Sequence, residues 1–506
     1  MILDCTIRDG GYYNFWDFDQ DLFFKYLDLT NLLPIDFVEI GYRGTESSGF
    51  YGLYYYLPEE TLNEIRNRSN KKIALMIDLK SIDNISQLKD LLKPCINKVD
   101  LIRFAINIYG KDFNRVENFF KTTKSLGFEV AANIMYASKW NQEDDFFKSE
   151  FKLKYIDYAY VVDSYGGLNP SNTHEKIEML KSKIDNSVLI GFHSHNNLEL
   201  ALANTISIIN KIDIIDSTIL GMGRGAGNLK TELILTYLNH TNKLNVNFNI
   251  LSEAVELFKI LHQKYQWGTN LPYMVAGTMS YPQKEVMELI SKRFVSLNTI
   301  VNTISNKNNK QKFLEISDYI GKDILVIGGG KNVFKYQTHI KKFIKNNPKL
   351  VLLHSSARNL NFFNDINNLQ LLSIVGNEGS RLEKNFDGFS LNSFSAFTPK
   401  SPQRINIPIP NIIKENAYEL PFEDEFTDGD STHTSNVATF LKNINANQIF
   451  SVGYDGYNVA NEFYSEIEVE NNKIFDSLKL SDINIISLTP SKYSSFIKSN
   501  IFYYTK

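Results

Sequence analysis

The sequence predicts two α/β units, a closed (β/α)8 TIM barrel followed by a smaller Rossmann-like α/β domain. Short β-branched or aromatic runs alternate with helix-length segments through the first half of the chain, and this alternation predicts a parallel sheet. Eight such units fit into roughly the 250 residues that a barrel of this type needs. An open doubly wound sheet would explain the alternation equally well, but it rarely needs eight units. After a polar segment the same rhythm restarts, which predicts the second domain.

The predicted barrel strands are apolar runs rich in Ile, Val, Leu and aromatic residues. They are residues 2–7, 36–42, 72–78, 99–105, 128–134, 157–163, 188–193 and 213–219. Segments such as 21–33 and 113–127 are long enough for the intervening helices, and Gly127 closes the second of them as a C-cap. We therefore place the barrel domain at residues 1–245.

A helical extension is predicted over residues 246–304 and is expected to pack against the barrel. Residues 305–313 are polar, charged and almost free of large aliphatic side chains, which favours a linker there. The second domain is predicted over residues 314–506. Its strands are predicted at 323–330, 349–356, 371–376 and 448–456.

Composition excludes some classes of partner and of environment. The formal net charge of −3 gives neither a basic field for nucleic acid nor a polybasic surface for a membrane. No run of 18 apolar residues predicts a membrane span, and a strand-like segment begins at Ile2 in place of a signal peptide. Cys5 and Cys95 cannot form a disulfide framework. These features predict a cytoplasmic protein.

Polar side chains stand where one mouth of the barrel should be. Active sites of this fold lie at the carboxyl ends of the strands. The residues predicted there are Arg8, Asp9, Glu39, Tyr42, Asp78, Arg103, Asn133, Asp163, Ser164, His193, His195 and Ser217. An apolar strand that ends in a polar group is common by chance, but eight in succession are less so.

His193 and His195 are two residues apart at the end of a strand, so both imidazoles point to one side and can reach one ion. Asp9 supplies a carboxylate from the first strand, which neighbours the last strands in a closed barrel. This ligand set suits a divalent Lewis acid, with Mn²⁺ foremost and Mg²⁺, Co²⁺ and Zn²⁺ as alternatives. Arg8 adds a fork of donors for an enolate or carboxylate oxygen. Alternatively, His193 is a buried hydrogen-bonded residue and Asp9 caps a helix.

Four motifs carry a resemblance to a known group of enzymes. "LDCTIRDGGY", "VVDSYGG", "GFHSHNNLELALANT" and "DSTILGMGRGAGNLKTELIL" together resemble the DRE-TIM metallolyase superfamily, and the order of the motifs matches. The resemblance covers about residues 1–300. It is nearest to the 4-hydroxy-2-oxovalerate aldolases and their HMGL-like catalytic domains.

The resemblance implies a metal-dependent lyase that makes or breaks a carbon–carbon bond between a 2-oxo acid such as pyruvate and an aldehyde. It implies that Asp9, His193 and His195 hold the divalent ion and that Arg8 steadies the developing enolate.

The same resemblance implies roles for three further residues around the mouth. Asp163 and Ser164 would line the substrate side from the sixth strand. Asn228, in "GAGN", would lie near the metal or stabilise the final loop.

The sequence departs from the aldolases at one position. These enzymes carry a histidine shortly after Arg-Asp-Gly that is thought to act as the general base, whereas this chain has Tyr12. A tyrosine has an unperturbed pKa near ~10, so it needs a perturbed environment to act as a base at neutral pH. The base is Tyr12, Asp78 or another group, and packing against substrate is an equally open role for Tyr12.

Two other functions fit the same residues. One is acyl-CoA Claisen condensation or cleavage on the same scaffold, although no CoA pocket is recognisable. The other is a non-catalytic metal-binding or regulatory module that serves the second domain. Assembly into a homo-oligomer is left open by the sequence.

The second domain contains a glycine turn between a strand and a helix, in "VIGGGKNVF". Such turns can bring backbone N–H groups to a phosphate, although a tight turn needs no ligand to explain it. The domain loosely resembles Rossmann-like domains attached to aldolases of bacterial surface-polysaccharide gene clusters. This resemblance implies a sugar-derived aldehyde, with a nucleotide-linked sugar as one candidate partner. The acidic segment 421–435 is expected to be a solvated loop.

Overall fold

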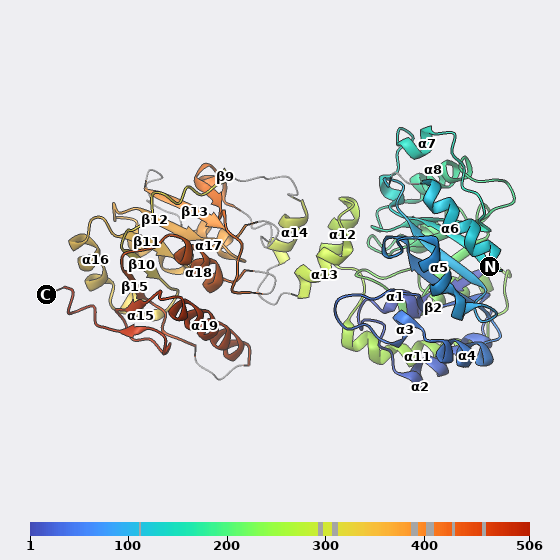
Figure 1. Cartoon of the computed structure of the whole chain (residues 1–506), viewed down its shortest axis with the longest axis horizontal. Coiled ribbons are helices and arrows are strands. Elements are labelled where there is room, and N and C mark those ends of the chain that lie inside the picture. Colours follow the sequence, from blue (N-terminus) through green and yellow to red (C-terminus); the bar gives the residue numbers. More distant parts are fainter. Residues whose placement is uncertain are drawn as a thin grey trace. The chain divides into compact units, whose positions relative to one another are not determined.

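The computed structural model contains two compact units, Met1–Glu288 and Leu289–Lys506 (Figure 1). It describes residues 1–110, 113–291, 297–305, 312–385, 393–400, 409–427, 431–457 and 462–505. Most of the predicted linker, residues 306–311, lies outside the described residues.

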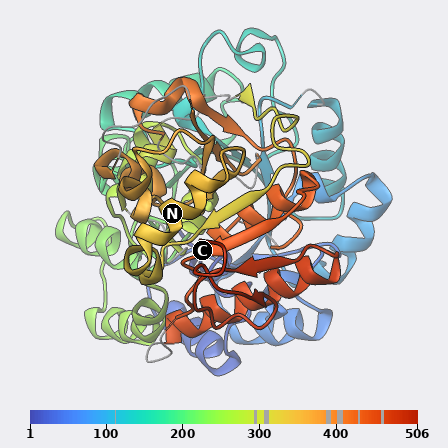
Figure 2. The same cartoon turned by 90° about the vertical axis from the view of Figure 1, so that its left-hand side faces the viewer.

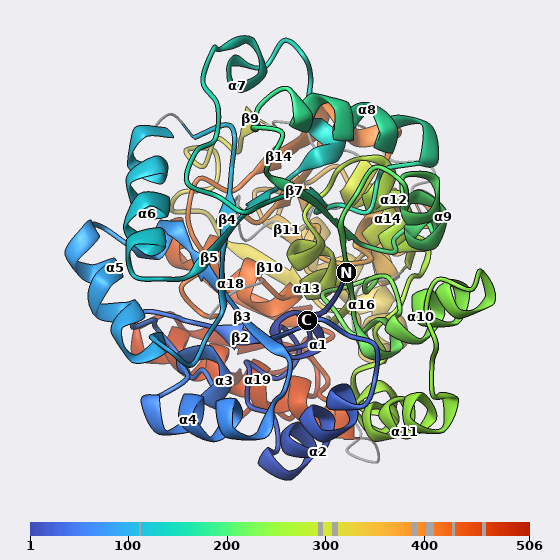
Figure 3. The ribbon, with the colours of Figure 1, turned by 90° about the vertical axis from the view of Figure 1, so that its right-hand side faces the viewer.

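The first unit is a closed barrel of eight parallel strands in sequence order, which confirms the predicted fold class. Figure 3 shows the helices arranged outside the ring of strands. The strands are β1 (Ile2–Asp4), β2 (Phe37–Tyr42), β3 (Lys72–Asp78), β4 (Leu101–Ile106), β5 (Glu129–Ile134), β6 (Tyr158–Asp163), β7 (Leu189–Ser194) and β8 (Ile214–Ser217).

The helices of this unit follow the strands. They are α1 (Thr6–Gly10), α2 (Gln20–Asn31), α3 (Leu53–Tyr56), α4 (Glu59–Arg68), α5 (Ile85–Leu92), α6 (Phe113–Ser125), α7 (Asp145–Lys148), α8 (Pro170–Lys181), α9 (Ala201–Ser207), α10 (Thr231–His240), α11 (Phe248–Tyr265), α12 (Leu271–Thr278) and α13 (Gln283–Ser291), with 3₁₀ turns η1 (Leu79–Ser81), η2 (Lys93–Cys95), η3 (Ala137–Lys139) and η4 (Ile219–Gly221). Local sequence fixes several ends. Asn169 forms a capping box at the start of α8, and Gly127 has a φ of +95° just after α6.

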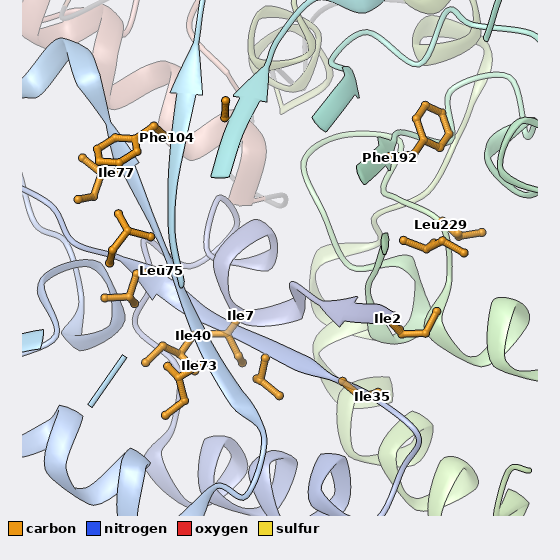
Figure 4. Packing of buried hydrophobic residues seen from close by; sticks show 14 of the residues in the cluster. Ile2, Ile7, Ile35, Ile40, Ile73, Leu75, Ile77, Phe104, Phe192 and Leu229 are labelled. Carbon is orange, nitrogen blue, oxygen red and sulfur yellow. The ribbon is translucent and has the colours of Figure 1, made fainter. Parts of the chain in front are cut away.

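The barrel core follows the two-residue period of the strands. Outward-facing residues such as Ile73, Leu75 and Phe104 pack against the helices in one large cluster (Figure 4). The residues that alternate with these along the strands face the inside of the barrel and form a second cluster, which includes Phe37, Ala74 and Leu101. Inward positions nearer the carboxyl ends of the strands are polar instead, and these positions build the site.

The first strand is shorter than the predicted 2–7, because a side chain ends it. The Asp4 carboxylate accepts hydrogen bonds from the backbone N–H (3.0 Å) and hydroxyl (2.6 Å) of Thr6 and closes a local turn. The chain then forms α1, so Arg8 and Asp9 lie on a helical turn rather than at the end of the strand itself.

Helices α11 and α12, and α13 as far as Glu288, extend the first unit beyond the eighth strand. The ring of Phe258 in α11 contacts the ring of Tyr26 in α2, with 5.5 Å between centroids. Gln283 at the start of α13 donates to the Asn197 side chain at 2.9 Å and accepts from the Ala226 N–H at 3.3 Å. This extension therefore fixes the loops that follow β7 and β8.

The second unit is built on a parallel sheet in the order β17-β16-β15-β10-β11-β12-β13-β14-β9. Figure 2 shows this unit facing the viewer. Its strands are β9 (Lys312–Phe313), β10 (Ile324–Ile327), β11 (Val351–His354), β12 (Gln370–Ser373), β13 (Phe394–Thr398), β14 (Ala417–Glu419), β15 (Ile449–Val452), β16 (Ile485–Ser487) and β17 (Ile497–Lys498). Its helices are α14 (Leu297–Ser305), α15 (Lys331–Lys335), α16 (Gln337–Asn346), α17 (Glu378–Asn385), α18 (His433–Asn443) and α19 (Glu462–Leu480), with turns η5 (Ala357–Phe363) and η6 (Asn411–Asn416).

Apolar residues cover both faces of this sheet. Helices α18 and α19 pack on one face, where Phe440 and Phe475 join the core of Val326 and Leu353. Helices α15 and α16 pack on the other, where Phe343 lies with Leu325 and Leu352. A parallel sheet between two helical layers confirms the predicted second α/β domain.

The glycine turn after β10 is shaped by the turn that follows β15. Gly330 donates to the carbonyl of Gly453 at 2.9 Å, and a Cβ at Gly330 would lie 2.4 Å from that oxygen. The carboxylate of Asp455 accepts from the N–H of Asn332 at 3.0 Å. Backbone packing therefore explains the glycine, and a carboxylate of the chain itself occupies the start of α15.

None of the described helices combines the length and apolar character that a membrane-spanning segment needs.

Candidate metal centre

Three buried side chains from distant parts of the sequence meet in the barrel. Asp9 comes from α1, His193 from β7, and His195 from the residue just beyond that strand. Oδ2 of Asp9 lies 3.4 Å from Nε2 of His193 and 4.0 Å from Nε2 of His195. The structure thus brings together the three predicted ligands, and one ligand atom from each lies within 4.8 Å of the others.

The His193 ring is oriented by Asp216, an inward-facing residue of β8. Nδ1 of His193 lies 2.9 Å from Oδ2 of Asp216, and this contact directs Nε2 towards Asp9. Burial lowers the pKa of His193, but hydrogen bonds with Asp216 and Asp9 outweigh it and leave the pKa raised. A carboxylate behind a histidine is the usual arrangement that fixes the ring of a metal ligand.

The His195 ring is oriented by backbone. Its Nδ1 lies 2.9 Å from the carbonyl oxygen of Asp163, so Nε2 is the nitrogen left for an ion. Nε2 is buried and has no hydrogen-bond partner in the described part of the chain. Burial, and then the charge of His193, lower the pKa of His195 to about 3, so the ring is neutral and carries a free lone pair at physiological pH.

Asp9 is held as an anion. Burial alone would raise its pKa, but the guanidinium of Arg8, at 2.6 Å, and His193 hold the pKa well below its ordinary value. The Asn228 amide donates to Oδ2 of Asp9, and Oδ1 of Asn228 is buried with no partner among the described residues.

Two of the candidate ligands, Asp9 and His193, belong to a closed ring of charged side chains inside the barrel. Arg8 Nε donates to Glu39 Oε2 at 2.8 Å, and the same oxygen accepts from Arg103 at 2.9 Å. Arg103 also donates to Asp216 Oδ2 at 2.5 Å, and the same oxygen contacts Nδ1 of His193. Every charge in this ring is buried. Loss of any one member would therefore leave a neighbouring charge buried without its partner, which is strongly destabilising.

Arg103 lies over the ring of Tyr160, with 4.3 Å from guanidinium carbon to ring centroid. Gly191 on the neighbouring strand makes room for that ring, because a Cβ there would lie 2.3 Å from it. The glycine in "LIGFHSH" therefore supports the polar layer beneath the metal centre.

These residues fit a divalent cation. Two imidazoles and one carboxylate are a common ligand set for first-row divalent ions. The unpartnered Nε2 of His195 and Oδ1 of Asn228 are buried polar atoms of the kind that a bound ion or its ligands would satisfy.

A second set of potential ligands, Cys5, His193 and Asp216, lies close by. Burial raises the pKa of the Cys5 thiol well above its ordinary value, so the thiolate that a metal would need is disfavoured. Oδ2 of Asp216 already contacts Arg103 and His193. We therefore favour the cluster of Asp9, His193 and His195.

Asp163 and Ser164 lie at this mouth but face the protein. The Asp163 carboxylate is fully buried and accepts from the N–H groups of Gly167 (3.0 Å) and Leu168 (3.1 Å). Burial raises the pKa of Asp163 to about 6. The Ser164 hydroxyl accepts from the N–H of Tyr136 at 2.9 Å. Both side chains hold loops in position, and the Asp163 carbonyl positions His195.

Tyr12 lies in a cluster of aromatic rings beside Arg8. Its hydroxyl is 3.0 Å from that of Tyr42, and its ring meets the edge of Trp16, with 4.9 Å between centroids. The Trp16 indole donates to the carbonyl of Arg8 at 2.8 Å. Asp78, the other candidate base, is exposed and accepts from the N–H of Lys80 at the turn after β3. Tyr12 is thus the candidate that the geometry favours.

The role of Asp216 and the pairing of Glu39 with Arg103 were not predicted from the sequence. The sequence does contain a signal for these pairs, because Glu39, Arg103 and Asp216 are charged residues within otherwise apolar strands. Charges inside buried strands need partners, and strands of one barrel can supply them.

Comparisons with known proteins agree with this geometry. The profile of the HMGL-like family matches residues 111–261. A 4-hydroxy-2-oxovalerate aldolase from Chloroflexus aurantiacus is 27% identical over 256 residues, which cover 50% of this chain and 72% of that protein. An oxaloacetate decarboxylase from Mycobacterium tuberculosis is 29% identical over 253 residues, covering 48% of this chain and 71% of the relative.

A solved structure gives a stronger match. The N-terminal domain of a protein from Bacteroides vulgatus, provisionally described as an aldolase, is 45% identical with a TM-score of 0.55. The match covers 60% of this chain and 99% of that domain.

Fold, site and relatives together define a barrel enzyme of the metal-dependent carbon–carbon lyase class. The chain belongs to the HMGL-like family, as its motifs predicted.

Removing the charge of Asp216 should weaken metal binding. We expect Asp216→Asn to lower the affinity about 10–100-fold at neutral pH, because the neutral amide orients His193 less firmly. The wild-type affinity should fall as the pH drops through the raised pKa of His193, since a proton then competes for Nε2. In the variant this fall should begin at lower pH. Competition titration against a fluorescent chelator over a pH series measures both effects.

Asp213→Asn is the matched control, because Asp213 is an exposed residue just before the same strand. Metal affinity in Asp216→Asn equal to that of this control would contradict the positioning role.

Proposed function

We propose that the chain is a divalent-metal-dependent aldolase that joins the enolate of a pyruvate-like 2-oxo acid to an aldehyde, or cleaves the product. The observation that carries this proposal is the convergence of Asp9, His193 and His195 next to a guanidinium, Arg8. The named activities of the relatives, an aldolase and a 2-oxo acid decarboxylase, support the same substrate class.

Asp9, His193 and His195 would hold the ion. When bound there, a divalent metal supplies Lewis-acid polarisation of the carbonyl group of the 2-oxo acid. Manganese is our first choice among the metals, since the carboxylate of Asp9 is a ligand that suits it.

Arg8 would stabilise the negative charge that develops on the substrate oxygen. Its guanidinium is fixed by Asp9 at 2.6 Å and by Glu39 at 2.8 Å, so it needs little reorganisation. Both carboxylates help to raise the pKa of Arg8 well above its ordinary value against the effect of burial, so Arg8 stays charged throughout the reaction.

The pair of Tyr12 and Tyr42 would handle the proton of the substrate hydroxyl. Burial raises the pKa of Tyr42 well above its ordinary value, so Tyr42 stays protonated and can donate a hydrogen bond to the Tyr12 oxygen. In cleavage, the 4-hydroxyl proton would pass by way of the Tyr12 oxygen while the bond between C3 and C4 breaks and leaves its electron pair on C3. C3 would take up one proton in return, so no net proton is gained or lost and the products are a 2-oxo acid and an aldehyde.

The natural aldehyde is proposed to be sugar-derived and to serve surface-polysaccharide synthesis in the cytoplasm. The order of the second sheet supports binding of a nucleotide-linked sugar there, since the strand order reverses at β10. Asp455, at the carboxyl end of β15, is suited to sugar hydroxyl groups rather than to a phosphate.

Acyl-CoA condensation and a purely regulatory metal module remain the competing functions. The first predicts turnover with an acyl-CoA in place of an aldehyde, and the second predicts no turnover with either.

Removing the metal should abolish the activity. We expect protein dialysed against a strong chelator to lose at least about a hundredfold in turnover of pyruvate with a panel of aldehydes. Addition of Mn²⁺ should restore it, because the ligands are oriented by contacts within the chain. The measurement is the amount of 4-hydroxy-2-oxo acid formed, which is quantified by chromatography. Undiminished turnover by stripped protein would refute the proposal.

A further inference from the structure

Arg224 is presented by a rigid loop between β8 and α10. The Tyr13 hydroxyl donates to the carbonyl of Gly225 at 3.1 Å, and Gln283 accepts from the N–H of Ala226 at 3.3 Å. Gly225 has a φ of +65°, and a Cβ there would lie 2.4 Å from Oε1 of Gln283. The backbone that directly follows Arg224 is therefore fixed by contacts with two other segments.

The guanidinium of Arg224 lies over the ring of Tyr12, with 4.9 Å from its carbon to the ring centroid. Its Nε is buried and contacts no acceptor in the described residues, and no carboxylate within those residues forms an ion pair with it. The other two arginines of the site differ, since Arg8 and Arg103 each contact two carboxylates.

A half-buried cation without a counter-ion loses hydration that no acceptor among the described residues replaces. Stacking on Tyr12 recovers a part of that cost. Asn228, in the same loop, donates to Oδ2 of Asp9, so this loop borders the candidate metal centre. A fixed and unpaired cation at the mouth of an active site is suited to an anionic group of a ligand.

We propose that Arg224 binds an anionic group, a carboxylate or a phosphate, on the aldehyde component of the reaction. This inference rests on the proposed aldolase function and narrows its substrate class. The 2-oxo acid has its own cation, Arg8, which is buried beside Asp9. Arg224 is the more exposed of the two and stands over the ring of Tyr12, the residue assigned to the hydroxyl that the aldehyde oxygen becomes.

The test uses aldehydes in matched pairs with pyruvate and the Mn²⁺-loaded full-length protein. Succinic semialdehyde is paired with butyraldehyde, and glyceraldehyde 3-phosphate with glyceraldehyde. The quantity measured is the ratio of kcat/KM for the anionic member to that for the neutral member. We expect a wild-type ratio well above one in at least one pair, and the pair with the larger ratio identifies carboxylate or phosphate.

Arg224→Gln should lower that ratio about 10–100-fold, the loss expected for a hydrogen bond to a charged group. Arg224→Lys should recover part of it, since it restores the charge without the planar fork. The control is Arg68→Gln, which removes one exposed positive charge that pairs with Asp28 on the helices α2 and α4. Equilibrium binding of succinate and of glycerol 3-phosphate to each protein gives a readout independent of turnover.

Two results would overturn the inference while the aldolase function stands. The first is a wild-type ratio near one in both pairs. The second is a ratio unchanged by Arg224→Gln, whether or not the KM for pyruvate rises. Absence of turnover with all four aldehydes in the metal-loaded wild type would instead refute the proposed function itself.

Discussion

Replacing Asp9 by asparagine is expected to remove the bound metal and to reduce turnover by on the order of 10³-fold. The carboxylate is the anionic member of the proposed ligand set, and its negative charge is already secured by Arg8 and His193. Asparagine has nearly the same shape but no charge. Metal content after gel filtration and kcat with pyruvate and aldehyde are the measurements.

Asp78→Asn is the matched control for this substitution. Asp78 also stands at the carboxyl end of a barrel strand, but it is exposed and caps a turn. It should retain metal content and activity within a factor of about two, as expected for a surface substitution. If Asp9→Asn kept one ion per chain and full turnover, Asp9 would not be a ligand.

Replacing Arg103 by methionine is expected to have the largest effect on stability. The change leaves Glu39 and Asp216 buried without their shared cation, and loss of one partner from such a pair costs about 3–5 kcal/mol. The melting temperature of the first unit should fall by about 6–20 °C. Differential scanning calorimetry of the full chain measures this change.

Arg66→Met is the control, because Arg66 forms a partly exposed ion pair with Asp100. Its cost should stay within about 1 kcal/mol. Arg103→Lys provides a second variant if the methionine protein does not fold, and it should be intermediate since it keeps the charge. A melting temperature of Arg103→Met equal to that of Arg66→Met would show that the buried ring is not needed for stability.

Much of the barrel could be predicted from the sequence because its signals are local. The strand-like runs and helix-length segments alternate visibly, and the spacing of His193 and His195 places both rings on one side of a strand. The polar residues at the strand ends follow from the same pattern. Asp9 could be added because the first and last strands of a closed barrel are neighbours.

The ring of charges could not be predicted in the same way. Glu39, Arg103 and Asp216 pair across strands that are far apart in sequence, and such pairing depends on the register of the closed barrel. The position of α1 was missed for a different reason. The carboxylate of Asp4 turns the chain after three strand residues, and this side-chain contact outweighs the strand propensity of "ILDCTI".

In the second unit β10, β11, β12 and β15 were predicted, but β13 and shorter strands such as β14 and β17 were not. β14 and β17 have three and two residues, so their identity comes from pairing with a neighbour. The environment of the glycine turn also required the fold, because Asp455 reaches Asn332 across 123 positions of sequence.

Anomalous X-ray diffraction from crystals grown with Mn²⁺ tests the central claim most directly. We predict one strong peak per chain in contact with the Asp9 carboxylate and with Nε2 of both His193 and His195, and no such peak in Asp9→Asn crystals. A peak in contact with other residues would contradict the proposed site. The absence of any peak near these three side chains at saturating Mn²⁺ would contradict it as well.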